Sequence, residues 1–126
     1  MAKETITAEK APAAVGPYVH AVKAGGFVFT SGQLGLDPET GTLPEGVAAQ
    51  AEQAIRNIET VLAAAGLALS DVVKTTVFLA DMKDFAVINE VYARYFADGA
   101  PARSCVQAAA LPKGGLFEIE VVAALR

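Results

Sequence analysis

Two stretches with helical spacing of apolar residues constrain the fold most. From 46 to 65, apolar residues recur every three or four positions, and Gly66 follows where a helix end favours left-handed backbone. The same spacing returns from 85 to 96, with Asp81 or Asp84 available as the N-terminal cap. These patterns predict two amphipathic helices.

Stretches of strand length surround the two helices and are rich in apolar or β-branched residues: 19–24, 27–33, 72–79, 103–109 and 116–125. Gly25 and Gly26 predict a tight hairpin turn between the first two, and residues 112–115 predict a turn between the last two. The order β-β-α-β-α-β-β predicts an α/β (α+β) two-layer sandwich, with both helices on one face of a sheet. We expect the 126 residues, 1–126, to form a single domain.

The alternation of side chains along the last strand separates two sheet faces. The side expected to meet the helices carries Phe117, Ile119, Val121, Ala123 and Leu125. The opposite side is expected to carry Glu118, Glu120 and Val122, joined by Arg103, Cys105, Gln107, Ser31 and Gln33 from other strands. Because an open face of this kind would leave Val122 in water, we expect self-association to cover it, with the polar groups near a subunit boundary.

Composition argues against several classes of partner. Lys and Arg number 10 against 14 Asp and Glu, a net charge of −4, so nucleic acid and anionic membranes are unsuited as partners. Cys105 is the one cysteine, which favours a reducing, cytoplasmic location. The sequence has no signal-peptide core and no run near the ~18 apolar residues of a membrane span, so we expect a soluble, untargeted protein. One His and one Cys supply no zinc-like ligand cluster, so no metal is expected.

From patterns alone, the polar residues also fit structural roles. Arg103 fits an ordinary solvated or ion-paired arginine equally well, and Glu118 and Glu120 fit exposed strand positions. Cys105 fits a small buried apolar residue. Surface or packing roles also suit His20, Tyr18, Ser31, Gly32 and Asn89. The patterns alone therefore predict an oligomeric α/β domain with an anion site at a subunit boundary.

Several separate motifs occur in order from about Lys10 to the C-terminus. They are 11–18 (APAAVGPY), 30–33 (TSGQ), 37–41 (DPETG), 73–79 (VKTTVFL), Asp84-Phe85 with Asn89, and 101–106 (PARSCV). Together they closely resemble the RidA family, also called the YjgF/YER057c/UK114 family. The resemblance implies a chorismate-mutase-like fold, a homotrimer whose sheets form a central barrel, and a site in each cleft between neighbouring subunits.

The resemblance also implies an activity, that of a 2-iminobutanoate/2-iminopropanoate deaminase, which hydrolyses reactive 2-imino acids to 2-keto acids and ammonia. Arg103 matches the family's carboxylate-binding arginine. Glu118 matches the acidic residue that holds the hydrolytic water together with the backbone carbonyl of Cys105. The surrounding pocket is matched by Tyr18, Ser31, Gly32 and Asn89, with Phe85 as an apolar wall. No cofactor is expected, because positioning and polarisation suffice for an imine that already hydrolyses in water.

Two other functions stand as alternatives. Some relatives are described as endoribonucleases or translation inhibitors, and a non-catalytic or chaperone-like trimer could hold small carboxylates without turnover. The glycine-rich turn from Lys113 to Phe117 departs from the family pattern, and it bears on substrate preference more than on chemistry. The sequence leaves the roles of Glu120 and His20 open.

Overall fold

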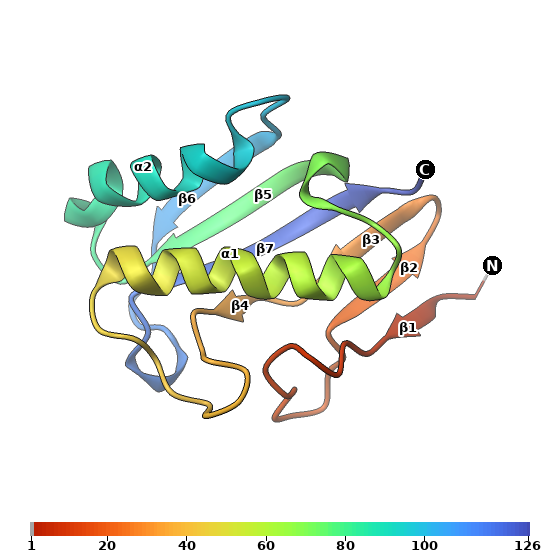
Figure 1. Cartoon of the computed structure of the whole chain (residues 1–126), viewed down its shortest axis with the longest axis horizontal. Helices are drawn as coiled ribbons and strands as arrows, with labels where there is room; N and C mark the ends of the chain where they lie inside the picture. The colour runs from red at the N-terminus through yellow and green to blue at the C-terminus, as the bar shows by residue number, and fades with distance from the viewer. Residues whose placement is uncertain (1) are drawn as a thin grey trace.

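The sheet of this protein is mixed, and both long helices lie on one of its faces (Figure 1). The computed structural model describes residues 2–126. The strands are β1 Glu4–Ile6, β2 Ala21–Ala24, β3 Phe27–Thr30, β4 Gln33–Leu34, β5 Val72–Leu79, β6 Ala102–Gln107 and β7 Phe117–Ala124. The helices are α1 Val47–Ala64 and α2 Phe85–Phe96, with short 3-10 turns at η1 Leu69–Asp71, η2 Met82–Asp84 and η3 Pro112–Gly114. This arrangement confirms the predicted α+β two-layer sandwich.

The sheet has the order β1-β2-β3-β7-β5-β6, and β4 also pairs with β7. All neighbours are antiparallel except β5 and β6, which run parallel because α2 connects them. The expected turn between the last two strands does not make them neighbours, since β5 lies between β6 and β7. The predicted strand 27–33 is also interrupted, because Ser31 and Gly32 separate β3 from β4. The three-residue strand β1 was not predicted.

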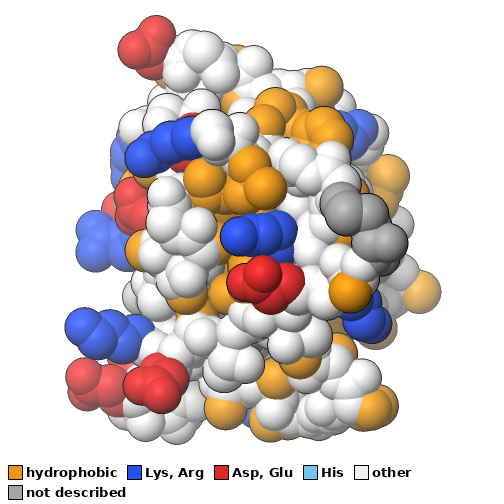
Figure 2. Space-filling view, turned by 90° about the vertical axis from the view of Figure 1, so that its right-hand side faces the viewer, with side chains coloured by type: hydrophobic (Ala, Val, Ile, Leu, Met, Phe, Trp, Pro, Cys, Tyr) orange, Lys and Arg blue, Asp and Glu red, His pale blue; other side chains and the backbone are white. Residues whose placement is uncertain are grey.

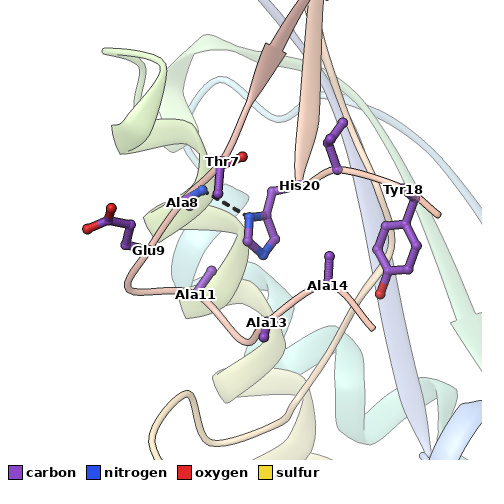
Figure 3. A pocket seen from close by; sticks show the side chains of 9 residues that line it. Thr7, Ala8, Glu9, Ala11, Ala13, Ala14, Tyr18 and His20 are labelled. Carbon is purple, nitrogen blue, oxygen red and sulfur yellow. Dashed lines mark hydrogen bonds between the residues drawn. The ribbon is translucent and has the colours of Figure 1, made fainter. Parts of the chain in front are cut away.

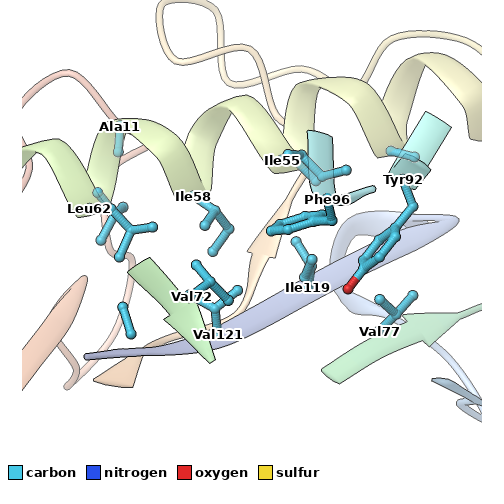
Figure 4. Packing of buried hydrophobic residues seen from close by; sticks show 14 of the residues in the cluster. Ala11, Ile55, Ile58, Leu62, Val72, Val77, Tyr92, Phe96, Ile119 and Val121 are labelled. Carbon is cyan, nitrogen blue, oxygen red and sulfur yellow. The ribbon is translucent and has the colours of Figure 1, made fainter. Parts of the chain in front are cut away.

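The core lies between the helices and the sheet (Figure 4). Helix α1 buries one side that includes Ile55, Ile58 and Leu62, each fully buried, as its apolar spacing predicts. The side chains of Phe117 and Ile119 on β7 meet them and are equally buried, which confirms the predicted helix-facing side of that strand. Each such side chain contributes about 1.5–3 kcal/mol through its removal from water.

The turns around these elements follow the expected chemistry. Gly25 and Gly26 have φ angles of 58° and 86°, and two successive positive φ angles are what a tight β2–β3 hairpin requires. The Asp81 side chain accepts a hydrogen bond from the Lys83 amide at 2.9 Å and begins η2, whereas Asp84 precedes α2 without a side-chain cap bond. Thus Asp81 caps the turn that leads into the second helix.

The sheet face away from the helices, called the open face below, is partly apolar. Phe27 and Phe29 are 40% and 45% exposed there, and Val122 is the strand partner of Phe29.

Figure 2 views the end of the molecule that holds the hairpin and both termini, where hydrophobic side chains reach the surface among interspersed positive and negative groups. Within residues 2–126, no helix is both long and apolar enough to cross a membrane.

Candidate active site

Arg103 lies on the edge strand β6, and its guanidinium rests against α2. Its Cζ atom is 4.7 Å from the ring centre of Tyr92 and 5.4 Å from that of Phe85, distances typical of cation–π contacts. Its Nη1 atom donates a hydrogen bond of 2.8 Å to Oδ1 of Asn89. Residues 85, 89 and 92 follow helical spacing and form one side of α2. Two rings and one amide oxygen on a single side of α2 therefore contact the guanidinium.

The positive charge of Arg103 is held without a carboxylate. The ion pairs of the described residues involve Arg56, Lys83 and Arg126, and Arg103 takes part in none of them. A guanidinium has five N–H donors, and Asn89 occupies one of them. A half-buried guanidinium with free donors can bind a carboxylate through two parallel hydrogen bonds.

Arg103 and Glu118 lie on opposite faces of the sheet in one chain. Arg103 pairs with Thr75, whose side chain is fully buried beneath α2, whereas Glu118 pairs with Phe78 on the open face. The expectation of the open face was therefore right for Glu118 and wrong for Arg103. The same correction applies to the remaining members of the expected set that pair with helix-side residues, namely Cys105, Gln107 and Gln33. Alternation within a strand separates its side chains into two sides, but it does not show which side meets the helices. The edge strand β6 has no buried residues that would indicate the helix side.

Glu118 lines a cavity of about 100 Å³, together with Tyr18, Gly32, Leu34 and Lys113. A Cβ atom placed on Gly32 would lie 2.5 Å from Oε2 of Glu118, so the glycine lets the carboxylate approach the backbone. Burial raises the pKa of the Glu118 carboxyl, and the nearby charge of Glu120 raises it further. A carboxylate of this kind is a stronger base than a solvated glutamate.

Buried amides on α1 hold the walls of the Glu118 cavity. The Asn57 side chain donates hydrogen bonds to the carbonyl oxygens of Leu34 and Leu36, at 3.0 and 2.9 Å. Oε1 of Gln50 accepts a bond of 2.9 Å from the amide of Leu116, close to the start of β7. Neither residue was predicted from the sequence, although polar side chains on the apolar side of a predicted helix are a signal for such a role.

His20 fixes the segment before Tyr18, and this segment lines a second pocket that shares Ala13, Tyr18 and His20 with the Glu118 cavity (Figure 3). Its Nδ1 atom accepts a hydrogen bond of 2.9 Å from the amide of Ala8, and its Nε2 atom donates one of 2.8 Å to the carbonyl of Pro12. Oγ of Ser31 donates to the carbonyl of Val19 at 2.6 Å. Tyr18, between these anchors, is 48% exposed. His20 and Ser31 thus hold the segment that presents Tyr18.

The residues singled out from the sequence form two groups in one chain. Arg103, Cys105, Phe85 and Asn89 lie on the side of the sheet covered by α2, whereas Glu118, Gly32 and Tyr18 meet at the Glu118 cavity, with Ser31 adjoining Gly32. Burial raises the pKa of the Cys105 thiol, and Arg103 offsets this in part, so the thiol stays protonated at neutral pH. Within residues 2–126, no group of three or more His, Cys, Asp or Glu residues is placed to hold a metal ion.

The fold and these two groups define a small α+β protein in which the guanidinium of Arg103 and the carboxylate of Glu118 lie on opposite sides of one sheet. The family model described as Endoribonuclease L-PSP matches residues 8–125, so the chain belongs to this family. The predicted membership of the RidA family is confirmed by relatives that match along nearly the whole chain.

One of these relatives is the 2-iminobutanoate/2-iminopropanoate deaminase of Salmonella typhimurium, 49% identical over 126 residues, with 98% of each chain covered. The protein of the same name from Bos taurus is 51% identical over 124 residues, covering 98% of this chain and 90% of the relative. Among solved structures, RidA from the Antarctic bacterium Psychrobacter superposes with a TM-score of 0.93 at 55% identity, covering 97% of this chain and 99% of that one. Escherichia coli TdcF with bound serine gives 0.92 at 46% identity, covering 98% and 99%.

Proposed function

We propose that this chain hydrolyses reactive 2-imino acids, such as 2-iminopropanoate and 2-iminobutanoate, to 2-keto acids and ammonia. The names of relatives at about half identity over nearly the whole chain support this activity. The observation in this chain that carries the proposal is Arg103, a guanidinium held by Asn89 and by two aromatic rings, without a carboxylate partner among the described residues.

Substrate binding begins with the carboxylate. Two parallel hydrogen bonds from Arg103 would hold this group, which is attached directly to the imine carbon, so they would fix the position of the C=N bond. Phe85, 5.4 Å from the guanidinium, provides apolar surface beside the carboxylate. The relative TdcF is described with bound serine, which carries a carboxylate of the same kind.

Glu118 supplies the base in this proposal. It would accept a proton from water as the water oxygen bonds to the imine carbon, while the imine nitrogen takes up a proton. In the resulting amino alcohol, the nitrogen takes a second proton from the Glu118 carboxyl, which had received it from water. The hydroxyl proton then leaves to solvent, the C=O bond forms, and the C–N bond breaks to release ammonia. The resemblance adds the backbone carbonyl of Cys105 as a second group on the water. General base catalysis of this kind contributes about 10²–10⁴-fold, and the raised pKa of Glu118 favours it.

The complete site would join two chains. Because Arg103 and Glu118 lie on opposite sheet faces, we infer that Arg103 acts with Glu118 of the partner subunit. A homotrimer whose open sheet faces line a central barrel would also cover the exposed rings of Phe27 and Phe29. This assembly is the one implied by the family resemblance.

The reaction exchanges C=N for C=O and involves no net oxidation, so we assign it no cofactor. The single cysteine, Cys105, fits the reducing conditions of the cytoplasm, where we place the reaction. RNA cleavage, which the family's description mentions, fits less well, because the net charge of −4 offers little attraction for phosphates.

A trapping assay tests the activity. A pyridoxal-phosphate dehydratase or an amino-acid oxidase would generate the imine, and semicarbazide would trap whatever the protein leaves unhydrolysed. We expect the wild-type chain to lower trapping and Arg103→Ala to lose on the order of a hundredfold in kcat/KM, because two charge-assisted hydrogen bonds disappear. Arg94→Ala is the matched control, since Arg94 is an exposed arginine of α2, the helix against which Arg103 rests, and this variant should retain activity. Unchanged trapping with wild-type protein, or full activity in Arg103→Ala, would refute the proposal.

A further inference from the structure

The ring closest to the guanidinium of Arg103 belongs to Tyr92, a residue that the sequence placed only in a helical pattern. We propose that Tyr92 is a positioning residue: it fixes the plane of the Arg103 guanidinium and thereby sets the affinity of the site for substrate carboxylates. This inference rests on the proposed function, and it concerns carboxylate binding rather than the attack of water.

Tyr92 differs from the other aromatic contact of Arg103 in its burial. The ring of Tyr92 lies 4.7 Å from Cζ and the residue is 8% exposed, whereas Phe85 lies at 5.4 Å and is 38% exposed. Cation–π attraction strengthens when the pair is shielded from water. The contact with Tyr92 is therefore the closer and the more shielded of the two.

The ring of Tyr92 is itself held in place from two sides. Its hydroxyl is 2.8 Å from Oγ1 of Thr75, and Thr75 is the strand partner of Arg103 across β5 and β6. The ring of Phe96 packs against it, with 4.5 Å between ring centres. Figure 4 shows Tyr92 pointing from α2 toward the sheet. The strand position beside Arg103 thus anchors the ring that covers Arg103.

Together, Tyr92 and Asn89 restrict the guanidinium in two ways. The ring covers the group, and Asn89 engages the single atom Nη1. A planar group that is held through its face and through one of its donors can adopt few orientations. Its free donors therefore point in few directions. A carboxylate then meets two N–H groups that need little further ordering, which reduces the entropy lost on binding.

Variants at position 92 separate the role of the ring from that of the hydroxyl. Tyr92→Leu keeps an apolar side chain but removes the π face, so we expect KM, and the Kd of 2-oxobutanoate measured by calorimetry, to rise about tenfold. The change in kcat should be within about threefold, because the base on the water is untouched. Tyr92→Phe and Thr75→Val each remove the hydrogen bond but keep the ring, which still packs against Phe96, so KM should rise by no more than about threefold. Tyr92→Met replaces Tyr92→Leu if thermal unfolding shows that the leucine variant does not fold.

A double-mutant cycle with Arg103→Ala distinguishes positioning from general stability. If Tyr92 acts through Arg103, then Tyr92→Leu should have no further effect on kcat/KM in an Arg103→Ala background. Equal effects of the leucine and phenylalanine variants, or full additivity with Arg103→Ala, would overturn the inference. Failure of the proposed function gives a different result, since Arg103→Ala would then itself retain full activity.

Discussion

Gly32 and Glu118 fit together only because position 32 has no side chain: a Cβ atom there would lie 2.5 Å from Oε2 of Glu118 and 2.9 Å from its Cδ. The two residues come from different parts of the sheet, the link between β3 and β4 and the strand β7. The position of the carboxylate is therefore set in part by the absence of a methyl group.

Gly32→Ala should displace the Glu118 carboxylate and lower kcat on the order of ten- to a hundredfold, because a shift of about 1 Å in a reacting group is costly. Stability should change little, since the carboxylate is the far end of a flexible side chain. Gly35→Ala is the contrasting variant: its Cβ would meet the backbone of Gln50 on α1, so it should lower Tm strongly. Wild-type kinetics in Gly32→Ala would show that the carboxylate position does not matter.

Stability should also respond to the charge of Glu118. Its raised pKa means that the fold favours the protonated form, so its stabilising contribution is full below the ordinary value of 4.5 and is lost as pH rises through the raised pKa. Glu118→Gln resembles the protonated form. We expect this variant to have a higher Tm than wild type at neutral pH. Its free energy of unfolding should be higher by no more than about 1 kcal/mol, because solvent screens the group. Thermal melts across pH should show the difference shrinking in acid; a lower Tm for Glu118→Gln at neutral pH is the contrary outcome.

The acidic side of the pH–rate profile should depend on Glu120. A base must be ionised to work, so kcat should fall as pH drops through the pKa of Glu118, at a higher pH than for an ordinary glutamate. Because the charge of Glu120 contributes to that raised pKa, Glu120→Gln should move the acidic limb to lower pH. Measurement of kcat from about pH 4 to 8 in both proteins checks this shift. A limb that stays in place, or moves to higher pH, contradicts the assigned base.

The sequence predicted the local elements well because their signals are local. Apolar spacing located α1 and α2, and Gly25-Gly26 located a hairpin. The strand order was harder, because whether β6 pairs with β5 or with β7 depends on contacts between distant segments. The face of Arg103 depends on that pairing, so alternation alone could not assign it.

The same limit applies to the candidate site. The family resemblance identified Arg103 and Glu118. It did not identify Tyr92, which contacts Arg103, or Asn57, which bonds to the backbone beside the Glu118 cavity. In sequence, Tyr92 is one more apolar residue of a helix, and Asn57 is one polar residue in a helix that is otherwise amphipathic. Their roles depend on which strand lies beneath them.

We propose that Arg103 of one chain acts with Glu118 of another, and an experiment that mixes two variants distinguishes this arrangement from a site within one chain. Arg103→Ala and Glu118→Gln, each expected to lose on the order of a hundredfold or more in activity, would be unfolded and refolded together in equal amounts. With random assortment, roughly a quarter of the sites would receive both native residues, so activity should return to roughly a quarter of wild type. Wild type refolded with an equal amount of the double variant should also give roughly a quarter, whereas a site within one chain would give roughly half. No recovery in the first mixture, with half activity in the second, would show that Arg103 and Glu118 act within one chain and would refute the shared site.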